Sequence, residues 1–193
     1  MSLKDNMMKK LKINKRQKMI NIILESIAFA AEKHKNQRRK DAEASPYINH
    51  PIALANVLAN EGGIANVDVL CAAILHDTIE DTETTESELN QNFGEKITSI
   101  VLEVTDDKTL PKETRKLKQI EHAPHASIEA KMVKLADKIC NVRDIIKSPP
   151  TDWSLERKQE YLKWSKNVVH GLRGTNIKLE KIFDELISKG ISS

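Results

Sequence analysis

Apolar residues along the chain recur at intervals of three and four, the spacing that places them on one face of an α-helix. The three clearest stripes are Ile20, Ile23, Leu24, Ile27, Ala28 and Ala31; Ile97, Ile100, Val101 and Val104; and Ile128, Val133, Leu135, Ile139, Val142 and Ile146. No segment sustains the alternation of apolar and polar residues that is typical of a half-buried strand. The pattern therefore predicts an all-α fold.

Residues that begin or end helices separate these stripes. The boundary signals are Gly62-Gly63 after a helix that opens near Pro51, a capping box at Thr85-x-x-Glu88, Gly94 after the next helix, and Pro149-Pro150 after the third stripe. Leu155 to Leu172 and Ile177 to Ile187 supply two further helices. We expect a bundle of roughly eight to ten helices. The pattern leaves open whether a small hairpin forms around Gln37 to Tyr47 or Asp106 to Pro111 in addition to the helices.

Length and composition favour one compact domain. A chain of 193 residues can bury a sizeable core without disulfides or structural metal. Cys71 and Cys140 both lie in apolar helical stretches, which indicates reduced core residues of a cytoplasmic protein. No apolar run approaches the ~18 residues of a membrane span, and the lysine-rich start lacks the apolar region of a signal peptide. We therefore expect no membrane partner.

The charge is distributed unevenly. Residues 1–18 carry seven basic groups and one acidic group, a charge of +6, whereas the whole chain is +3, so that residues 19–193 are left with −3. A nucleic-acid-binding domain would carry its basic residues as a patch on the folded part. We therefore expect residues 1–18 to form a flexible, solvated tail, residues 19–193 to form a single domain, and no nucleic acid to bind. Contact of the tail with RNA or a membrane is the less favoured alternative.

A histidine and three carboxylates follow directly on the apolar run that ends at Leu75. In a helix, His76 would lie one turn from Glu80, and Asp77 one turn from Asp81. Carboxylates at these spacings repel one another, and burial adds several kcal/mol for each uncompensated charge. A divalent metal held by His76 and Asp77, with Glu80 and Asp81 handling protons, would remove this conflict. The plainer alternative is a helix end that frays into a solvated acidic loop.

Two further segments offer ligands of the same kind. His50 precedes Pro51 at the start of a predicted helix, and Asp137 lies in a strongly helical run with Asn141 four residues later on the same face. A lone helical aspartate flanked by lysines is more often a solvated charge. Together with His76 and Asp77, however, these residues predict a site of two histidines and two aspartates. Such a nitrogen and oxygen set suits one Mn²⁺, Fe²⁺ or Zn²⁺ ion better than Ca²⁺.

Five motifs, in order, give the chain a specific resemblance. They are Gln37-Arg38-Arg39-Lys40-Asp41, Pro46-Tyr47-Ile48-Asn49-His50-Pro51, Leu75-His76-Asp77-Thr78-Ile79-Glu80-Asp81-Thr82, Thr105-Asp106-Asp107-Lys108 and Val133-Lys134-Leu135-Ala136-Asp137-Lys138. The chain resembles the HD-type metal phosphohydrolases, and within them the hydrolase domain of the RelA/SpoT enzymes and their small, stand-alone SpoT homologues. The resemblance covers about residues 20 to 190. Met1 to Lys18 has no counterpart in it.

The resemblance implies a (p)ppGpp 3′-pyrophosphohydrolase that uses Mn²⁺ and yields GDP or GTP and pyrophosphate. It implies that Glu80 and Asp81 position and deprotonate the attacking water. The residues implied or suggested to contact the nucleotide substrate are Arg39, Lys40, Lys112, Asn141, Arg157 and Tyr161. Two alternatives stay open: an NADPH 2′-phosphatase, because NADPH also carries a phosphate on its ribose, and a catalytically silent nucleotide sensor. The sequence leaves the oligomeric state open.

Overall fold

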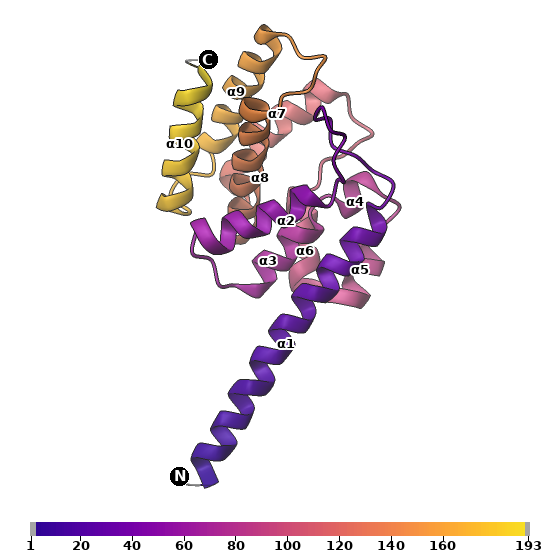
Figure 1. The fold of residues 1–193 in the computed structure, drawn as a ribbon, viewed down its shortest axis with the longest axis vertical. Coiled ribbons are helices and arrows are strands. Elements are labelled where there is room, and N and C mark those ends of the chain that lie inside the picture. Colours follow the sequence, from indigo (N-terminus) through magenta and orange to yellow (C-terminus); the bar gives the residue numbers. More distant parts are fainter. Residues whose placement is uncertain (1–2, 192–193) are drawn as a thin grey trace.

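The computed structural model describes the backbone of residues 3–191 and the side chains of residues 13–190. Ten α-helices occupy this part of the chain (Figure 1): α1 (Leu3–Lys33), α2 (Asn49–Asn56), α3 (Val67–Leu75), α4 (Thr78–Asp81), α5 (Glu86–Phe93), α6 (Glu95–Val104), α7 (Lys112–His122), α8 (Ile128–Lys147), α9 (Leu155–His170) and α10 (Ile177–Ile191). A π-helical turn, Val57–Glu61, extends α2, and a 3₁₀ turn, Ala123–His125, follows α7. The predicted all-α fold and the predicted number of helices are confirmed.

Helices α3 and α8 form the centre of the bundle. α3 has an almost entirely apolar sequence and packs against α1, α2, α6 and α8, while α8 also contacts α9 and α10. The fully buried side chains of this core include Leu54, Ile74, Leu135, Ile139 and Phe183. Burial of large side chains of this kind stabilises a fold by roughly 1.5 to 3 kcal/mol each. Among the described residues, no helix is both long enough and apolar enough to cross a membrane.

The predicted helix boundaries agree with the structure. The hydroxyl of Thr85 accepts a hydrogen bond from the amide of Glu88 at 3.2 Å, which caps the first turn of α5. Gly94 ends that helix with φ +80°, a conformation that a glycine adopts without strain. The expected hairpin at 37–47 is reduced to one antiparallel bridge between Arg38 and Pro46. The 106–111 segment forms a turn without a bridge.

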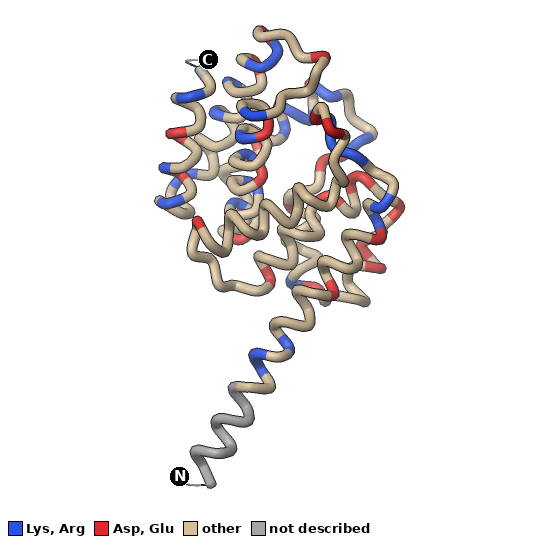
Figure 2. Tube along the Cα trace, in the orientation of Figure 1, with Lys and Arg blue, Asp and Glu red and all other residues tan. Residues whose placement is uncertain are grey.

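The first helix is longer than the apolar stripe implies. Residues 3–18 form its first half, and Figure 1 shows this half extending away from the other helices. In the described part of this extension, residues 13–18, the charged positions are all basic: Lys15, Arg16 and Lys18 (Figure 2). The predicted stripe is wrong in detail: Ile20 and Leu24 are exposed, and Ser26 and Ala30 are buried against the body. The flexibility of residues 1–18 and the boundary at residue 19 stay predictions.

Candidate metal centre and active site

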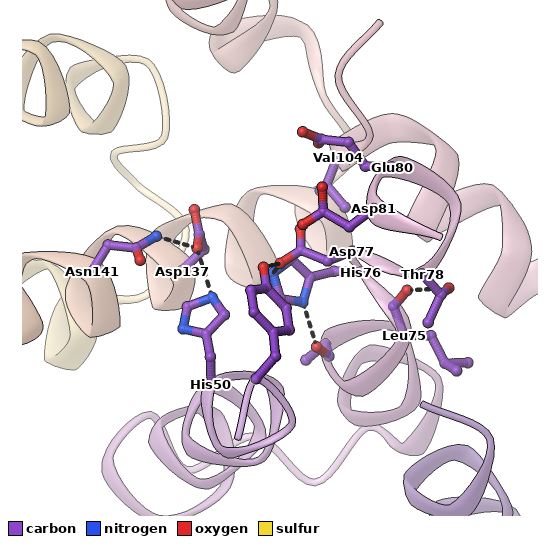
Figure 3. Close-up of polar contacts among 12 residues, drawn as sticks. His50, Leu75, His76, Asp77, Thr78, Glu80, Asp81, Val104, Asp137 and Asn141 are labelled. Atoms are coloured by element: carbon purple, nitrogen blue, oxygen red, sulfur yellow. Dashed lines mark hydrogen bonds and ion pairs between the residues drawn. The ribbon is translucent and has the colours of Figure 1, made fainter. Parts of the chain in front are cut away.

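Three segments that are far apart in the sequence meet at one point (Figure 3). His50 is the second residue of α2, His76 and Asp77 lie between α3 and α4, and Asp137 is in the middle of α8. Because α8 packs against both α2 and α3, these side chains share one cavity of about 190 Å³. His50, His76 and Asp137 are buried. The structure thus brings together all four residues that the sequence suggested as ligands.

The segment around His76 is not the continuous helix that the sequence pattern suggested. α3 ends at Leu75, and the hydroxyl of Thr78 donates a hydrogen bond to the carbonyl oxygen of Leu75 at 2.7 Å. Asp77 has φ −98° and ψ −1°, which lies outside regular helix geometry. Neighbouring residues of a helix point in different directions. The break instead lets His76 and Asp77 point to the same place, with 2.9 Å between Nε2 and Oδ2.

The atoms of this cluster lie close enough together to hold a cation. One ligand atom each from His50, His76 and Asp137 lies within 4.8 Å of the other two. Nδ1 of His76 donates to the carbonyl oxygen of Ala73 at 2.8 Å, so that Nε2 is the nitrogen that offers a lone pair once the ring is neutral. This buried Nε2 faces the carboxylate of Asp77 without a well-directed hydrogen bond. A histidine held by a backbone carbonyl in this way is typical of metal ligands.

The electrostatics of the cluster show the same need for positive charge. Burial opposes protonation of His76, but the carboxylate of Asp77 outweighs burial and raises the pKa of His76 to about 9. Against the effect of burial, His76 and His50 lower the pKa of Asp77 far below its ordinary value. Lys138 and His50 do the same for the pKa of Asp137. Both aspartates are therefore ionised, and the residues present fit a divalent ion.

Glu80 and Asp81 follow on α4, next to the cluster (Figure 3). Burial and the charge of Asp77 raise the pKa of Glu80 to about 7, which suits a group that takes up protons near neutral pH. One carboxylate oxygen of Glu80 accepts from the amide of Asp106 at 3.1 Å, and the other lies 3.7 Å from Nη1 of Arg115. Asp81 forms an ion pair with Lys108. Both carboxylates line the cavity of the cluster.

Asp137 is held by side chains on both of its oxygens. The buried ammonium group of Lys138 donates to Oδ2 at 3.1 Å, and Nδ2 of Asn141 donates to Oδ1 at 2.6 Å. Lys138 in turn lies 4.4 Å from the ring centroid of Trp164 on α9, close enough for a cation–π contact. Nε2 of His50 is 3.3 Å from Oδ1. These contacts leave the carboxylate little freedom to turn away from the cluster.

Two of the six residues expected to contact substrate, Arg39 and Asn141, also line the metal cavity. A guanidinium nitrogen of Arg39 lies 3.3 Å from the side-chain oxygen of Asn141 and 2.6 Å from a carboxylate oxygen of Asp144. Lys40 follows on the rim and is exposed. An adjoining hollow of about 350 Å³ includes Arg39, Lys40 and Tyr161.

The remaining basic residues lie in a neighbouring hollow of about 680 Å³. Lys40, Lys112, Arg157 and Tyr161 all line it, and it shares Asp106 and Gln119 with the metal cavity. Lys112 is the first residue of α7. The residues that the sequence suggested as substrate contacts thus line the metal cavity or one of two hollows that share lining residues with it.

Several further residues of this site could not be recognised from the sequence pattern. The hydroxyl of Tyr47 donates to Oδ2 of Asp77 at 2.5 Å, and burial together with Asp77 raises the pKa of this phenol. Lys134 and Lys138 line or support the cluster from α8, where their lysine character suggested solvated charges. Two sequence signals could have indicated these residues. Tyr47 lies in the same motif as His50, and Asp137 has Lys134 and Lys138 on either side of it in the sequence.

An all-helical bundle with this cluster of histidines and aspartates defines a metal-dependent hydrolase. The sequence profile of the HD domain family matches residues 26–163 of the chain. The chain therefore belongs to the HD domain family, and the resemblance found in the sequence motifs is confirmed.

Within this family, the chain is similar over most of its length to relatives that carry names. The guanosine-3′,5′-bis(diphosphate) 3′-pyrophosphohydrolase MESH1 of Xenopus tropicalis is 56% identical over 172 residues, which cover 89% of this chain and 96% of the relative. The protein of the same name from Homo sapiens is 53% identical over 167 residues, 86% of this chain and 93% of the relative. A solved structure described as a metazoan ortholog of SpoT that hydrolyses ppGpp superposes with a TM-score of 0.85 at 45% identity, covering 87% of this chain and 94% of that one.

Proposed function

We propose that this chain is a guanosine-3′,5′-bis(diphosphate) 3′-pyrophosphohydrolase that converts ppGpp and pppGpp to GDP and GTP, each with release of pyrophosphate. The observation that carries this proposal is the similarity over nearly the whole length to relatives that bear this activity in their names, at 53 to 56% identity. A solved structure of 45% identity is described as hydrolysing ppGpp. The buried histidine and aspartate cluster supplies the chemistry that such a reaction needs.

His50, His76, Asp77 and Asp137 are proposed as the ligands of one divalent ion. Mn²⁺ is our choice, because the family resemblance implies it and the set contains no thiolate; Fe²⁺ and Zn²⁺ suit the same ligands. When bound, the ion would supply Lewis acidity at the phosphoryl oxygens and lower the pKa of water. Two observations support this assignment: Nε2 of His76 is buried without a hydrogen-bond partner, and Asp77 is ionised.

The reaction requires water to attack the phosphorus that is bound to the ribose 3′ oxygen, which breaks the O–P bond. Glu80 and Asp81 are proposed to orient this water and accept its proton, and the raised pKa of Glu80 supports that role. The basic residues Arg39, Lys40 and Lys112 would neutralise the substrate's phosphates. Arg157 and Tyr161 are proposed to contact the phosphate side of the substrate and Asn141 its ribose or a phosphate, since these residues line the metal cavity and the two hollows beside it.

Product analysis with purified protein tests the proposal. The metal-stripped protein is incubated with ppGpp and, in parallel, with NADPH, with and without added Mn²⁺, and the products are separated by anion exchange. We expect pyrophosphate and GDP from ppGpp only when Mn²⁺ is present. Release of inorganic phosphate from NADPH as the faster reaction would favour the 2′-phosphatase instead. Binding of ppGpp in calorimetry without turnover of either substrate would favour a silent sensor.

We also propose that the protein works in the cytoplasm. Both cysteines, Cys71 and Cys140, are buried and unpaired. Burial raises the pKa of Cys140 to about 12, so that its thiol stays protonated and unreactive. A reducing compartment suits such residues.

A further inference from the structure

Gln37 lies in the connection between α1 and α2. This connection passes close to α4, the short helix that carries Glu80 and Asp81 (Figure 1). The side chain of Gln37 is half-buried, and it lines neither the metal cavity nor the two hollows beside it. Any part that Gln37 plays in the proposed reaction must therefore be exerted through the residues that it contacts.

The side-chain amide of Gln37 has a partner on each side, and these partners fix its orientation. Nε2 of Gln37 donates to the carbonyl oxygen of Asp81 at 2.5 Å, and Nδ1 of His34 lies 2.7 Å from Oε1 of Gln37. Because a carbonyl oxygen can only accept, the amide nitrogen must face Asp81 and the amide oxygen must face His34. Nδ1 of the buried His34 therefore carries a proton and donates it to this oxygen.

The helix α4 needs support of this kind because it has only four residues. The amide of Asp81 donates to the carbonyl oxygen of Asp77 at 2.8 Å, and the amide of Thr82 donates to that of Thr78 at 3.1 Å. A single turn is unfavourable by itself, since few hydrogen bonds offset the ordering of its backbone. The last carbonyl groups of a helix also lack partners within it. The bond from Gln37 gives the carbonyl group of Asp81 a partner and ties the end of α4 to the body.

The other end of α4 is held through Tyr47. The backbone amide of Tyr47 donates to the backbone carbonyl oxygen of Gln37 at 3.2 Å, and its ring packs on that of His34 with 4.8 Å between the centroids. The hydroxyl of Tyr47 donates to Oδ2 of Asp77, the residue that precedes α4, at 2.5 Å. Tyr47 thus holds the proposed metal ligand, whereas Gln37 holds the end of α4 that carries Asp81.

We propose that Gln37 is a positioning residue, which holds the end of α4 so that the carboxylates of Glu80 and Asp81 face the metal cavity. Both carboxylates line that cavity, and a shift of the short helix would move them together. A displacement of about 1 Å at reacting groups can lower a rate on the order of a hundredfold. The hold on α4 stands on the contacts alone, whereas the effect on catalysis rests on the proposed function.

Amide hydrogen exchange, followed by mass spectrometry of peptides that contain residues 78–82, tests the hold on α4. Gln37→Met removes the donor and keeps a side chain of similar length. We expect it to speed exchange in α4 about fivefold, the effect of losing one neutral hydrogen bond. Asn36→Met is the matched control, because Asn36 is exposed on the adjoining turn, and it should exchange like the wild type. Circular dichroism confirms that both variants are folded. Unchanged exchange in Gln37→Met, or the same acceleration in Asn36→Met, would overturn the proposal.

A double-mutant cycle on ppGpp hydrolysis tests the effect on catalysis. We expect Gln37→Met to lower kcat about tenfold, with KM and bound metal unchanged. In the background of Glu80→Gln, Asp81→Asn, the same change should have little effect, because the carboxylates that Gln37 positions are already absent.

Gln37→Glu keeps an acceptor for His34 but has no donor for the carbonyl oxygen of Asp81, so that it should be no more active than Gln37→Met. A loss of kcat by the same factor in both backgrounds would indicate a general structural role and overturn the proposal, as would wild-type kcat in Gln37→Met or Gln37→Glu. If the wild-type protein does not hydrolyse ppGpp at all, the proposed function fails, while the exchange result still decides whether Gln37 holds α4.

Discussion

Replacing Glu80 by Gln should make the metal-free protein more stable at pH 8 than the wild type, although the change removes a proposed catalytic group. Burial and the neighbouring Asp77 raise the pKa of Glu80 from 4.5 to about 7. The folded state therefore binds this proton more tightly than the unfolded state does. The stabilisation is fully present below about pH 4.5 and is lost as the pH rises through 7. Above that pH, the ionised carboxylate weakens the fold, and a neutral amide does not.

The size of the effect follows from the two pKa values of Glu80. At about 1.4 kcal/mol for each pKa unit, the difference between 4.5 and about 7 corresponds to about 3.5 kcal/mol as an upper limit. The side chain is 17% exposed, so that solvent screens only part of its charge. The introduced glutamine would keep the size of the side chain, and its carbonyl oxygen can still accept from the amide of Asp106. We expect a gain of roughly 1 to 3 kcal/mol at pH 8 and little gain at pH 4.5.

Urea unfolding in the presence of a chelator, at pH 4.5 and pH 8, measures this difference for wild type and variant. Glu83→Gln serves as the control, because Glu83 is an exposed glutamate on the same acidic segment. The slope of the free energy of unfolding against urea should not change, since the surface exposed on unfolding is the same. A variant that is no more stable than wild type at pH 8 would show that the ionised carboxylate of Glu80 does not destabilise the fold. The raised pKa would then no longer support Glu80 as the proton acceptor.

Three further predictions concern the cluster and the cleft. Asp137→Ala should lose bound metal as well as turnover, because an anionic ligand from α8 is removed; copurification with a full equivalent of metal, by elemental analysis, would rule Asp137 out as a ligand. The double change Glu80→Gln, Asp81→Asn should keep the metal and lower kcat by roughly two orders of magnitude or more, and activity within a few-fold of wild type would assign the proton transfer to other groups. Lys112→Ala should raise KM for ppGpp about tenfold and raise it less for NADPH, whose target is a single phosphate; equal increases would make Lys112 a general electrostatic contributor.

The cluster of histidines and aspartates could be predicted from the sequence because polar residues of this kind are rare in their apolar surroundings. His76 and Asp77 interrupt an apolar helix that is buried on all sides, so that their polarity required an explanation. The helix break that brings the two side chains together could not be predicted. Leu75, His76 and Asp77 are all compatible with a helix, and the break depends on the local hydrogen bond between Thr78 and Leu75. The π-helical turn Val57–Glu61 left no sequence signal either.

The supporting residues were hidden for a different reason. Lysine is almost always solvated, and Lys138 in a helix with other lysines predicts a surface charge. In the structure it is 3% exposed, because Trp164 from a helix that follows later in the chain covers it. Tyr47 reaches Asp77 only through the folding of the 34–48 segment. Contacts of this kind depend on tertiary packing, about which the periodicity of the sequence says nothing.

The buried lysine explains how the cluster folds with two ionised aspartates at its centre. Removing one partner of a buried charge pair typically costs roughly 3 to 5 kcal/mol, so each carboxylate needs a fixed positive group. Asp77 has the protonated His76, whose pKa of about 9 keeps its charge at neutral pH, whereas Asp137 has Lys138. Only the first of these charges can be given up to a metal ion, because imidazole becomes a neutral ligand on losing its proton. The arrangement therefore keeps a permanent counter-charge behind Asp137 and an exchangeable one at the place where the ion is proposed to bind.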